Sequence, residues 1–241
     1  MLSHEQLSTV RSHVKNRILL ALPELEFQRI LPHLAFVGLR MGQVLYEADS
    51  WIDYAYFMNS GMASLLAVTA DGETVEIGPV GNGGVMGIQA ALGEDRVFYS
   101  GVVQIPGNAM RIRSDALRHE FQHNAELSRL LLDHMRDLHL QVSQSVGCNR
   151  FHSLEQRLCR RLLVTQDYAS SDRFSVTYEF LSHMVGASRT PVTLAAEALQ
   201  EAGLISCRRS YIRIIDRKGM EARTCECYRI FPEGCERRSA A

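Results

Sequence analysis

The chain has 241 residues, of which 46% are hydrophobic and 22% are charged, and its formal net charge is −1. These proportions are typical of a soluble globular protein with one large domain or two small ones. No apolar run approaches the ~20 residues of a membrane-spanning helix, and the apolar cluster at residues 18–22 is too short for a signal peptide. We therefore expect a cytoplasmic protein that has no membrane partner.

Charge is distributed unevenly along the chain. Residues 149–241 carry 15 Lys and Arg residues against 11 Asp and Glu residues, which gives this part a net charge of +4. The total of −1 therefore leaves −5 for residues 1–148. Unless this division arises by chance, the positive C-terminal part favours phosphate binding at one end of the molecule only.

The first half of the chain predicts two helices followed by a sheet. Residues 13–33 fit two short helices that are separated at Pro23. From residue 36 to residue 113, short apolar runs alternate with glycines, and Asp71-Gly72 has the sequence of a tight hairpin turn. This texture predicts an antiparallel β-roll, so we assign residues 1–113 to an N-terminal, sensor-like roll domain.

A long helix is predicted next, because glycine and proline are absent between Gly107 and Gly147. Ser114 is placed to cap this helix, which we expect to occupy residues 114–150. Four of its apolar residues recur at spacings of four, three and four, as in a coiled-coil seam: Leu131, Met135, Leu138 and Val142. We predict that this stripe is the interface of a homodimer. Packing against the roll of the same chain is the alternative.

Residues 151–241 have the pattern of a winged helix-turn-helix domain. One amphipathic helix is predicted from four leucines: Leu154, Leu158, Leu162 and Leu163. Thr177 is placed to cap the next helix, and Gly186 can adopt the left-handed backbone of the tight turn that follows. Ser188 is placed to cap the last helix, which tolerates Pro191 only because this residue lies in its first turn.

The last helix of this motif has two different faces. Its apolar face is formed by Val192, Ala195, Ala196 and Leu199. Three polar residues lie on the opposite face near its N-terminus, the end that a recognition helix inserts into the DNA major groove: Arg189, Thr190 and Thr193. Two short strands are predicted after residue 204. They form a wing whose Arg208 and Arg209 are placed to meet phosphate oxygens.

Together these elements resemble the family of the cyclic-AMP receptor protein and the fumarate–nitrate regulator, Crp/Fnr. The most specific match is Val185-Gly186-Ala187-Ser188-Arg189 with Val192, Leu199 and Gly203-Leu204-Ile205, and Asn59-Ser60-Gly61 followed by Asp71-Gly72 supports it. The resemblance implies an α+β fold: an antiparallel, cyclic-nucleotide-binding-like β-roll of the double-stranded jelly-roll type, a dimerisation helix and a winged helix-turn-helix. It also implies a homodimeric transcription regulator that binds palindromic double-stranded DNA and contacts RNA polymerase, with an effector that is unknown.

The resemblance assigns roles to single residues of the recognition helix. It implies that Ser188 contacts the phosphate backbone and that Arg189 contacts a base edge, which we expect to be guanine. Thr190 stands where many relatives have a base-reading glutamate, and Leu194 stands where many have a second base-reading arginine. We therefore expect a target sequence different from the family's best-known half-site, with more reliance on DNA shape.

The residues of the implied effector pocket depart further from the family pattern. By position, they are Gly84, Gly87, Ile88, Tyr99, Ser100 and Ser143. Ile88 replaces the glutamate that holds the ribose in cyclic-nucleotide binders, and Tyr99 replaces the arginine that holds the cyclic phosphate. Because a buried phosphate without a cation is costly, we expect a regulator that cyclic AMP does not control. Arg96 is near in sequence, and compensation of the phosphate charge by this residue is the alternative.

We expect no cofactor. The iron–sulfur cluster of the family uses N-terminal cysteines, and no cysteine precedes Cys148 in this chain. Further along, Cys225 and Cys227, with Cys207 and Cys235, are candidates for a soft-metal site or a redox pair. Their C-x-C spacing differs from the C-x-x-C of common zinc sites, so free thiols are the alternative.

One enzyme hypothesis has to be weighed against DNA binding. His119-Glu120-Phe121-Gln122-His123 matches the H-E-x-x-H pattern of zinc peptidases, in which two histidines on one helix face hold the metal and the glutamate is the general base. A third ligand would have to come from Glu126 or His134. We predict that the protein is not an enzyme, and we retain zinc-dependent hydrolysis and ligand sensing without a transcriptional role as alternatives.

Overall fold

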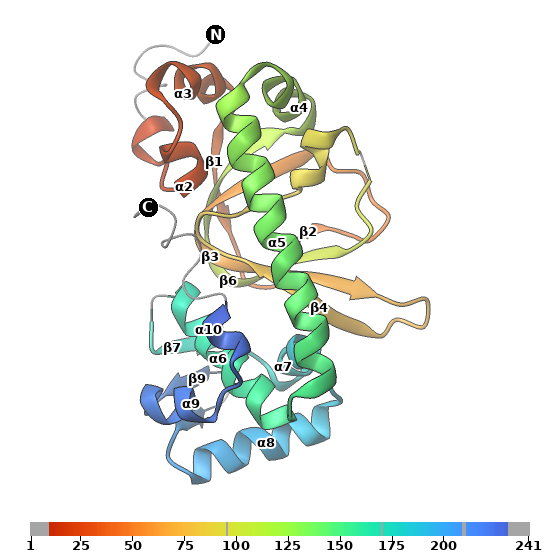
Figure 1. The fold of residues 1–241 in the computed structure, drawn as a ribbon, viewed down its shortest axis with the longest axis vertical. Coiled ribbons are helices and arrows are strands. Elements are labelled where there is room, and N and C mark those ends of the chain that lie inside the picture. Colours follow the sequence, from red (N-terminus) through yellow and green to blue (C-terminus); the bar gives the residue numbers. More distant parts are fainter. Residues whose placement is uncertain (1–9, 95, 170, 209–210, 231–241) are drawn as a thin grey trace. The chain divides into compact units, whose positions relative to one another are not determined.

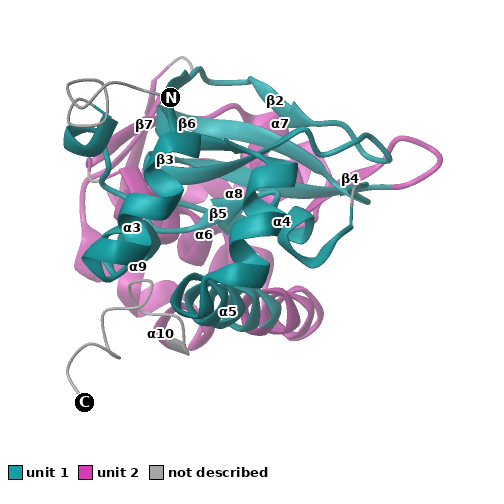
Figure 2. Ribbon diagram, turned by 90° about the horizontal axis from the view of Figure 1, so that it is seen from above, with its two compact units in different colours: residues 1–68, 78–139 teal, residues 69–77, 140–241 magenta. Residues whose placement is uncertain are grey.

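The structure, a computed structural model, describes residues 10–94, 96–169, 171–208 and 211–230. The chain forms two compact units (Figure 2). Unit 1 contains residues 1–68 and 78–139, and unit 2 contains residues 69–77 and 140–241. Within the described ranges, no helix is both long and apolar enough to cross a membrane. The segment boundaries at residues 113 and 150 stay a prediction.

Unit 1 is organised by a six-stranded sheet with the strand order β1-β6-β3-β4 (Figure 1). β2 also pairs with β6, and β5 pairs with β3. The strands are β1 (Ala35–Leu39), β2 (Val44–Tyr46), β3 (Tyr54–Val68), β4 (Thr74–Val80), β5 (Val85–Met86) and β6 (Ser100–Arg113). The β1, β2, β3 and β5 pairings are antiparallel, which confirms the predicted roll.

Gly61 lies inside a strand instead of ending one. Its φ is +80°, and a Cβ atom here would lie 2.5 Å from the carbonyl oxygen of Ile105 on β6. Gly107 on β6 would likewise bring a Cβ atom against the backbone of Ser60. The register between β3 and β6 shifts in this segment. Glycine at both positions therefore lets the two backbones approach closely, and β3 continues through a residue whose type usually marks a turn.

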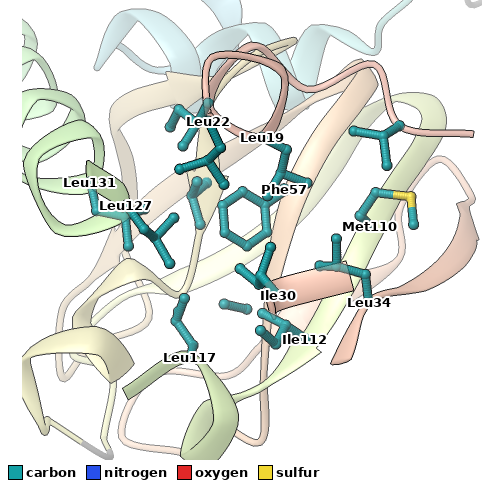
Figure 3. Close-up of a cluster of buried hydrophobic side chains, with 14 of the residues drawn as sticks. Leu19, Leu22, Ile30, Leu34, Phe57, Met110, Ile112, Leu117, Leu127 and Leu131 are labelled. Atoms are coloured by element: carbon teal, nitrogen blue, oxygen red, sulfur yellow. The ribbon is translucent and has the colours of Figure 1, made fainter. Parts of the chain in front are cut away.

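Helices pack against the sheet and complete the core of unit 1. They are α2 (Arg17–Leu20), α3 (Glu24–Ile30), the 3₁₀ segments η1 (Leu31–His33) and η2 (Ile88–Leu92), α4 (Ser114–His123) and the first half of α5 (Ala125–Phe151). α2 and α3 are the two short helices that the sequence predicts around Pro23. Figure 3 shows Leu127 and Leu131 of α5 gathered with Phe57 of β3 in this core, where all three are fully buried.

The prediction of a single helix for residues 114–150 is wrong at one point, because Asn124 separates α4 from α5. The backbone of Asn124 is extended, with φ −125° and ψ 94°. Its side chain accepts a hydrogen bond of 2.9 Å from the backbone N–H of Leu127 and so caps α5. An asparagine side chain competes for backbone donors in this way, so a helix can end without glycine or proline.

Ser114 does not cap α4 as predicted, because it is the first helical residue and its hydroxyl donates to the carbonyl oxygen of Ile52. At its other end, α5 runs through Gly147 to Phe151. Ser153 then starts the next helix with a reciprocal capping box. The N–H of Gln156 donates to the Ser153 hydroxyl at 3.2 Å, and the N–H of Ser153 donates to the Gln156 side chain at 3.0 Å.

Unit 2 contains the second half of α5 and a compact domain of helices and short strands. These elements are α6 (Leu154–Ala169), β7 (Arg173–Ser175), α7 (Tyr178–Val185), α8 (Arg189–Glu201), β8 (Ile205–Arg208), β9 (Tyr211–Ile214), α9 (Arg217–Arg223) and α10 (Cys227–Ile230). Leu158, Leu162 and Leu163 of α6 are fully buried in the core, as their spacing predicts. The strands form a second sheet with the order β7-β9-β8.

Asn16 links the helical N-terminal segment of unit 1 to the sheet. It is fully buried, and its side-chain oxygen accepts hydrogen bonds from the backbone N–H groups of Ile18 and Leu19. Its side-chain nitrogen donates at 3.0 Å to the carbonyl oxygens of Met58 and Gly84. One amide thus satisfies four backbone groups that are out of reach of water.

We predict that Asn16→Ala lowers the free energy of unfolding by about 2–4 kcal/mol, because the substitution leaves buried donors and acceptors unpaired. Asn149→Ala on the exposed side of α5 is the matched control, with an expected change below about 0.5 kcal/mol. Chemical denaturation followed by circular dichroism measures both values. Equal losses in the two variants would contradict the structural role of Asn16.

Candidate nucleic-acid interface

α7 and α8 form a helix-turn-helix in unit 2. Thr177 caps α7 by accepting a hydrogen bond of 3.1 Å from the N–H of Phe180. Gly186 ends α7 in the left-handed conformation, with φ 60° and ψ 48°, and its N–H donates to the carbonyl oxygen of Ser182. The N–H of Ala187 donates to the same oxygen at 3.1 Å. The cap and the turn predicted from the sequence are therefore both confirmed.

Burial of one face fixes the orientation of α8 within unit 2. Val192, Ala196 and Leu199 are fully buried against α6 and α7. The N-terminal part of the opposite face is exposed: Ser188, Arg189, Thr190 and Leu194. Thr193 is only partly exposed, and its hydroxyl donates to the Arg189 carbonyl oxygen at 3.0 Å. The structure thus presents a cationic, hydroxyl-bearing helix end to solvent, the arrangement that contacts DNA in other helix-turn-helix domains.

Ser188 occupies the N-cap position of α8 but does not cap it as predicted. Its backbone is extended, with φ −67° and ψ 158°, as expected for this position. Its side chain, however, accepts no capping hydrogen bond from the described part of α8. The hydroxyl is exposed, and the first N–H groups of α8 point out of the helix end. These donors remain available to an anionic group such as a phosphate.

β8 and β9 form the predicted wing, and β7 adds a third strand that the sequence analysis missed. Arg208, at the end of β8, is exposed, whereas Arg209 lies outside the described residues. Ile212 and Ile214 of β9 are buried on one face. On the other face, Arg213 forms an ion pair of 2.8 Å with Asp172, which precedes β7. Arg213 is therefore engaged within the chain, and Arg173 of β7 lies over the Tyr211 ring, 4.4 Å from its centroid, whereas the described part of β8 exposes Arg208.

Residues 69–77 form the turn predicted at Asp71-Gly72. Gly72 has a φ of +83°, and the N–H of Thr69 donates to the carbonyl oxygen of Glu73 at 2.9 Å. Glu76 follows and forms a buried ion pair with Arg161 of α6. Burial lowers the pKa of Arg161, and the Glu76 carboxylate opposes that shift. The sequence alone gave no signal for this pair, because its members are 85 residues apart.

The interior of the roll around Gly87 is occupied by aromatic side chains. A Cβ atom on Gly87, whose φ is +73°, would strike the Tyr46 hydroxyl. That hydroxyl donates to the Tyr54 carbonyl oxygen at 2.8 Å. The Tyr99 hydroxyl donates to the Gln89 side chain at 2.8 Å, and burial raises the pKa of Tyr99 to about 12. The interior therefore presents neutral phenols where a cyclic phosphate would need a cation.

The other residues predicted for the effector pocket are differently placed. Ile88 is buried in the core of unit 1, and Gly84 has no room for a side chain because Val80 lies 2.7 Å from its Cβ position. The Ser100 hydroxyl accepts a hydrogen bond of 3.2 Å from the N–H of Ala48. Ser143 is exposed on the part of α5 that belongs to unit 2.

Arg96 does not take the place of the phosphate-binding arginine. It is exposed, and its guanidinium donates to the carbonyl oxygen of Asp49 at 3.0 and 2.6 Å. The same group lies over the Trp51 ring, 5.9 Å from its centroid. Arg96 therefore holds the loop before β3 rather than supplying charge to the interior.

Two family models match the chain in the same order as these structural parts. The cyclic nucleotide-binding domain matches residues 36–124, and the Crp-like helix-turn-helix domain matches residues 156–223. Together the two models cover more than half of the chain. The chain belongs to the Crp/Fnr family of transcription regulators.

Solved structures with this fold are similar to the Crp/Fnr chain at low sequence identity. The c-di-GMP responsive global regulator CLP of Xanthomonas campestris is 16% identical, with a TM-score of 0.68, and the match covers 80% of this chain and 100% of that one. FixK2 of Bradyrhizobium japonicum is 13% identical, with a TM-score of 0.68 and coverages of 80% and 98%. A CRP/FNR family regulator of Thermus thermophilus is 21% identical, with a TM-score of 0.65 and coverages of 78% and 97%. No curated protein sequence matches the chain significantly.

The apolar stripe predicted on the long helix of this Crp/Fnr protein is partly corrected by the structure. Leu131 is fully buried in the core of its own chain and so is not free to contact a partner, whereas Met135 packs against the same core but is only partly buried. Leu138 and Val142 are half-buried. The apolar residues that α5 exposes are instead Leu132, Leu140, Val146 and Phe151. The coiled-coil spacing correctly indicates a buried face, but the packing within the chain accounts for its first half.

The H-E-x-x-H segment of the Crp/Fnr chain lies on α4. His119 and His123 are exposed, and their rings stack with a centroid separation of 4.3 Å. Glu120 is buried, away from the solvent that the histidine rings face. Within the described ranges, no third His, Cys, Asp or Glu completes a metal-binding group with these histidines. The geometry therefore gives the zinc-hydrolase alternative no support.

We predict that Gly186→Ala destabilises unit 2 by about 1–2 kcal/mol, because a residue with a Cβ atom is strained in the left-handed conformation. The new methyl group would also lie 3.3 Å from the Val75 side chain. Gly147→Ala is the matched control, because it lies in α5 and its Cβ position has no described atom within 4 Å. The control should stabilise the protein by roughly 0.5–1 kcal/mol. Opposite signs in denaturant unfolding are expected, and equal signs would contradict the strained turn.

Proposed function

We propose that this Crp/Fnr regulator acts as a homodimer that reads a palindromic DNA site through α8, independently of cyclic AMP. The observation that carries the proposal is the exposed N-terminal end of α8, with Arg189, Thr190 and Leu194 on the face opposite the core. Arg189 contacts guanine, Ser188 and the α8 N-terminus contact phosphate, and Leu194 contacts a thymine methyl group. Thr190 and Thr193 complete this surface.

Dimerisation follows from what one recognition helix can read. A single helix contacts a few base pairs, and two copies one DNA turn apart, about 34 Å, gain both affinity and register. The exposed apolar residues Leu132, Leu140 and Val146 on α5 support a helix-to-helix interface. Members of the family are generally dimeric. RNA polymerase is the proposed protein partner once the dimer occupies its site.

Independence from cyclic AMP is supported by the interior of the roll. Ile88 is buried where the family pattern has a ribose-binding glutamate, and Tyr99 is neutral where it has an arginine. A buried phosphate monoanion would lack the arginine that the family pattern supplies at the position of Tyr99, and Arg96 is engaged with the Asp49 carbonyl oxygen. The effector, if there is one, therefore has a chemistry different from that of cyclic AMP.

We predict that Arg189→Ala weakens binding to the selected DNA site by about 1–3 kcal/mol and relaxes the preference at one base position in each half-site. Selection from a random DNA pool first identifies the site, and fluorescence anisotropy then measures Kd on that site and on random DNA. An equal loss of affinity on both DNAs would contradict base reading by Arg189.

Arg208→Ala is the control for this experiment, because Arg208 is exposed on the wing and is assigned to phosphate only. It should weaken binding to all sequences alike and reduce the slope of log K against log salt by about 1. A changed base preference in this variant would place the wing in the base-reading surface.

We predict that Val146→Glu shifts the protein toward the monomer, because the substitution places a charge in the proposed interface. The dimer dissociation constant should rise at least about tenfold, which corresponds to about 1.4 kcal/mol. Leu25→Glu, which changes an equally exposed apolar residue on α3, is the control and should leave the dimer intact. Light scattering measures the mass of each variant, and an unchanged dimer in Val146→Glu would contradict this interface.

We expect no heat of binding when the protein is titrated with cyclic AMP, and no change in the Kd for specific DNA. A stoichiometric interaction would contradict the proposed independence. Because the Xanthomonas relative is described as c-di-GMP responsive, this dinucleotide is titrated in parallel. Its binding would identify an effector without affecting the conclusion on cyclic AMP.

A further inference from the structure

Four side chains of metal-ligating type meet inside unit 2: Cys148, His152, Cys225 and Cys227. Their ligand atoms all lie within 4.8 Å of one another. Cys148 and His152 are one helical turn apart at the end of α5, where the N–H of His152 donates to the Cys148 carbonyl oxygen at 3.2 Å. Cys225 lies in the segment that joins α9 to α10, and Cys227 is the first residue of α10. Two parts of the chain separated by more than 70 residues therefore converge on one point.

The distances within this cluster fit the edges of a tetrahedron around one zinc ion. With Zn–S bonds of about 2.3 Å and Zn–N bonds of about 2.0–2.1 Å, tetrahedral angles give an S···S edge of about 3.8 Å and an S···N edge of about 3.6 Å. The Sγ atoms of Cys148 and Cys225 are 3.7 Å apart, and the Cys227 Sγ is 3.6 Å from the His152 Nδ1. The cluster thus already has two edges of the required length.

Two residues outside the cluster, Glu226 and Gln144, contact its ligand side chains. The Nε2 of His152 lies 3.1 Å from a carboxylate oxygen of Glu226. Because a carboxylate only accepts hydrogen bonds, Nε2 carries the proton and Nδ1 keeps its lone pair for a metal. On the other side, the Gln144 side chain donates to the Cys227 sulfur at 2.8 Å. A carboxylate that orients a histidine is the usual arrangement around zinc.

The three cysteines are buried, but they form a cluster of their own that is distinct from the hydrophobic core of the domain. Cys148, Cys225 and Cys227 are 0%, 3% and 1% exposed, and they form a buried cluster of their own. His152 closes the cluster with a side chain that is 16% exposed. A set of three thiolates and one imidazole favours zinc over magnesium and calcium, because magnesium and calcium prefer oxygen ligands.

We propose that Cys148, His152, Cys225 and Cys227 bind one Zn²⁺ ion in a closed, tetrahedral site. Four protein ligands leave no open position for substrate, so the site is structural. It fastens the segment that contains Cys225, Cys227 and α10 to the last turn of α5. Metal binding and folding of this segment are therefore coupled. The site is separate from the H-E-x-x-H motif on α4.

The structure changes the set of cysteines that the sequence suggests. Cys207 lies on β8, where its N–H donates to the Gln200 side chain, and it is not part of the cluster. Cys235 lies outside the described residues. Cys148 and His152 take their place, because an i, i+4 pair lies on one helix face. The C-x-C pair is thus completed by a C-x-x-x-H pair that starts in the last turn of α5 and ends at the residue directly after it.

The test measures metal on the full-length protein isolated under reducing conditions. Elemental analysis should find about one zinc ion per chain. After removal by a chelator, Co²⁺ should restore intense visible bands of a tetrahedral site together with thiolate-to-cobalt charge transfer. Copper or iron at full occupancy in place of zinc would overturn the assignment of the metal. Protein that binds neither Zn²⁺ nor Co²⁺ would overturn the site.

Matched variants assign the ligands. Cys227→Ser should lower the zinc affinity by at least about a hundredfold and the charge-transfer intensity by about a third, because one of three thiolates is lost. Cys207→Ser removes a cysteine of the same unit that lies outside the cluster, and it should bind zinc like the unchanged chain. Equal zinc affinity of these two variants would overturn the proposal.

Glu226→Gln keeps all four ligands and so tests the site even if a ligand variant fails to fold. It should lower the zinc affinity by about 10–100-fold, since the carboxylate no longer orients His152, while the circular dichroism of the zinc-loaded protein stays unchanged. Unchanged affinity would contradict ligation through Nδ1. A Cys148–Cys225 disulfide in the freshly reduced and purified protein, found by thiol titration and mass spectrometry, would identify a redox pair and overturn the zinc site.

Discussion

The presentation of Arg189 depends on one constraint, the shared burial of α6, α7 and α8 in the core of unit 2. Leu162 of α6, Leu181 of α7 and Leu199 of α8 are each fully buried in that core. An apolar helix face has to be covered, and here each helix covers the other two. Once the inner face of α8 is fixed, its outer face is fixed as well. The side chains that we propose to face DNA are exposed because the apolar side chains of α8 face the core.

The turn at Gly186 makes this packing possible. The left-handed backbone reverses the chain within a few residues, so α7 and α8 can cover the same core without a long connection. The wing covers the same core, since Ile212 and Ile214 of β9 are buried in it. The zinc site that we propose would link the end of α5 to Cys225 and to Cys227, the first residue of α10. The proposed DNA-reading surface and the proposed zinc site thus lie in different parts of one unit.

The roll retains the family's strand plan with a changed interior. Gly61 and Gly107 preserve the close approach of β3 and β6, because a Cβ atom at either position would collide with the backbone opposite. The ligand-facing chemistry is less constrained by the fold, since Tyr46 and Tyr99 fill space and donate hydrogen bonds without carrying charge. A scaffold can therefore persist while its effector changes.

The sequence by itself determined several local features: the cap at Thr177, the turn at Gly186, the division of α8 into a buried and an exposed face, and the family. These features depend on residues that are close in the sequence, so the local sequence pattern is sufficient to predict them. Only the tertiary structure decided that Leu131 packs inside its own chain. It also decided that Glu76 pairs with Arg161, and that Cys148 and His152 join two cysteines far along the chain. These outcomes depend on which distant segments meet, and that is set by the packing of whole elements.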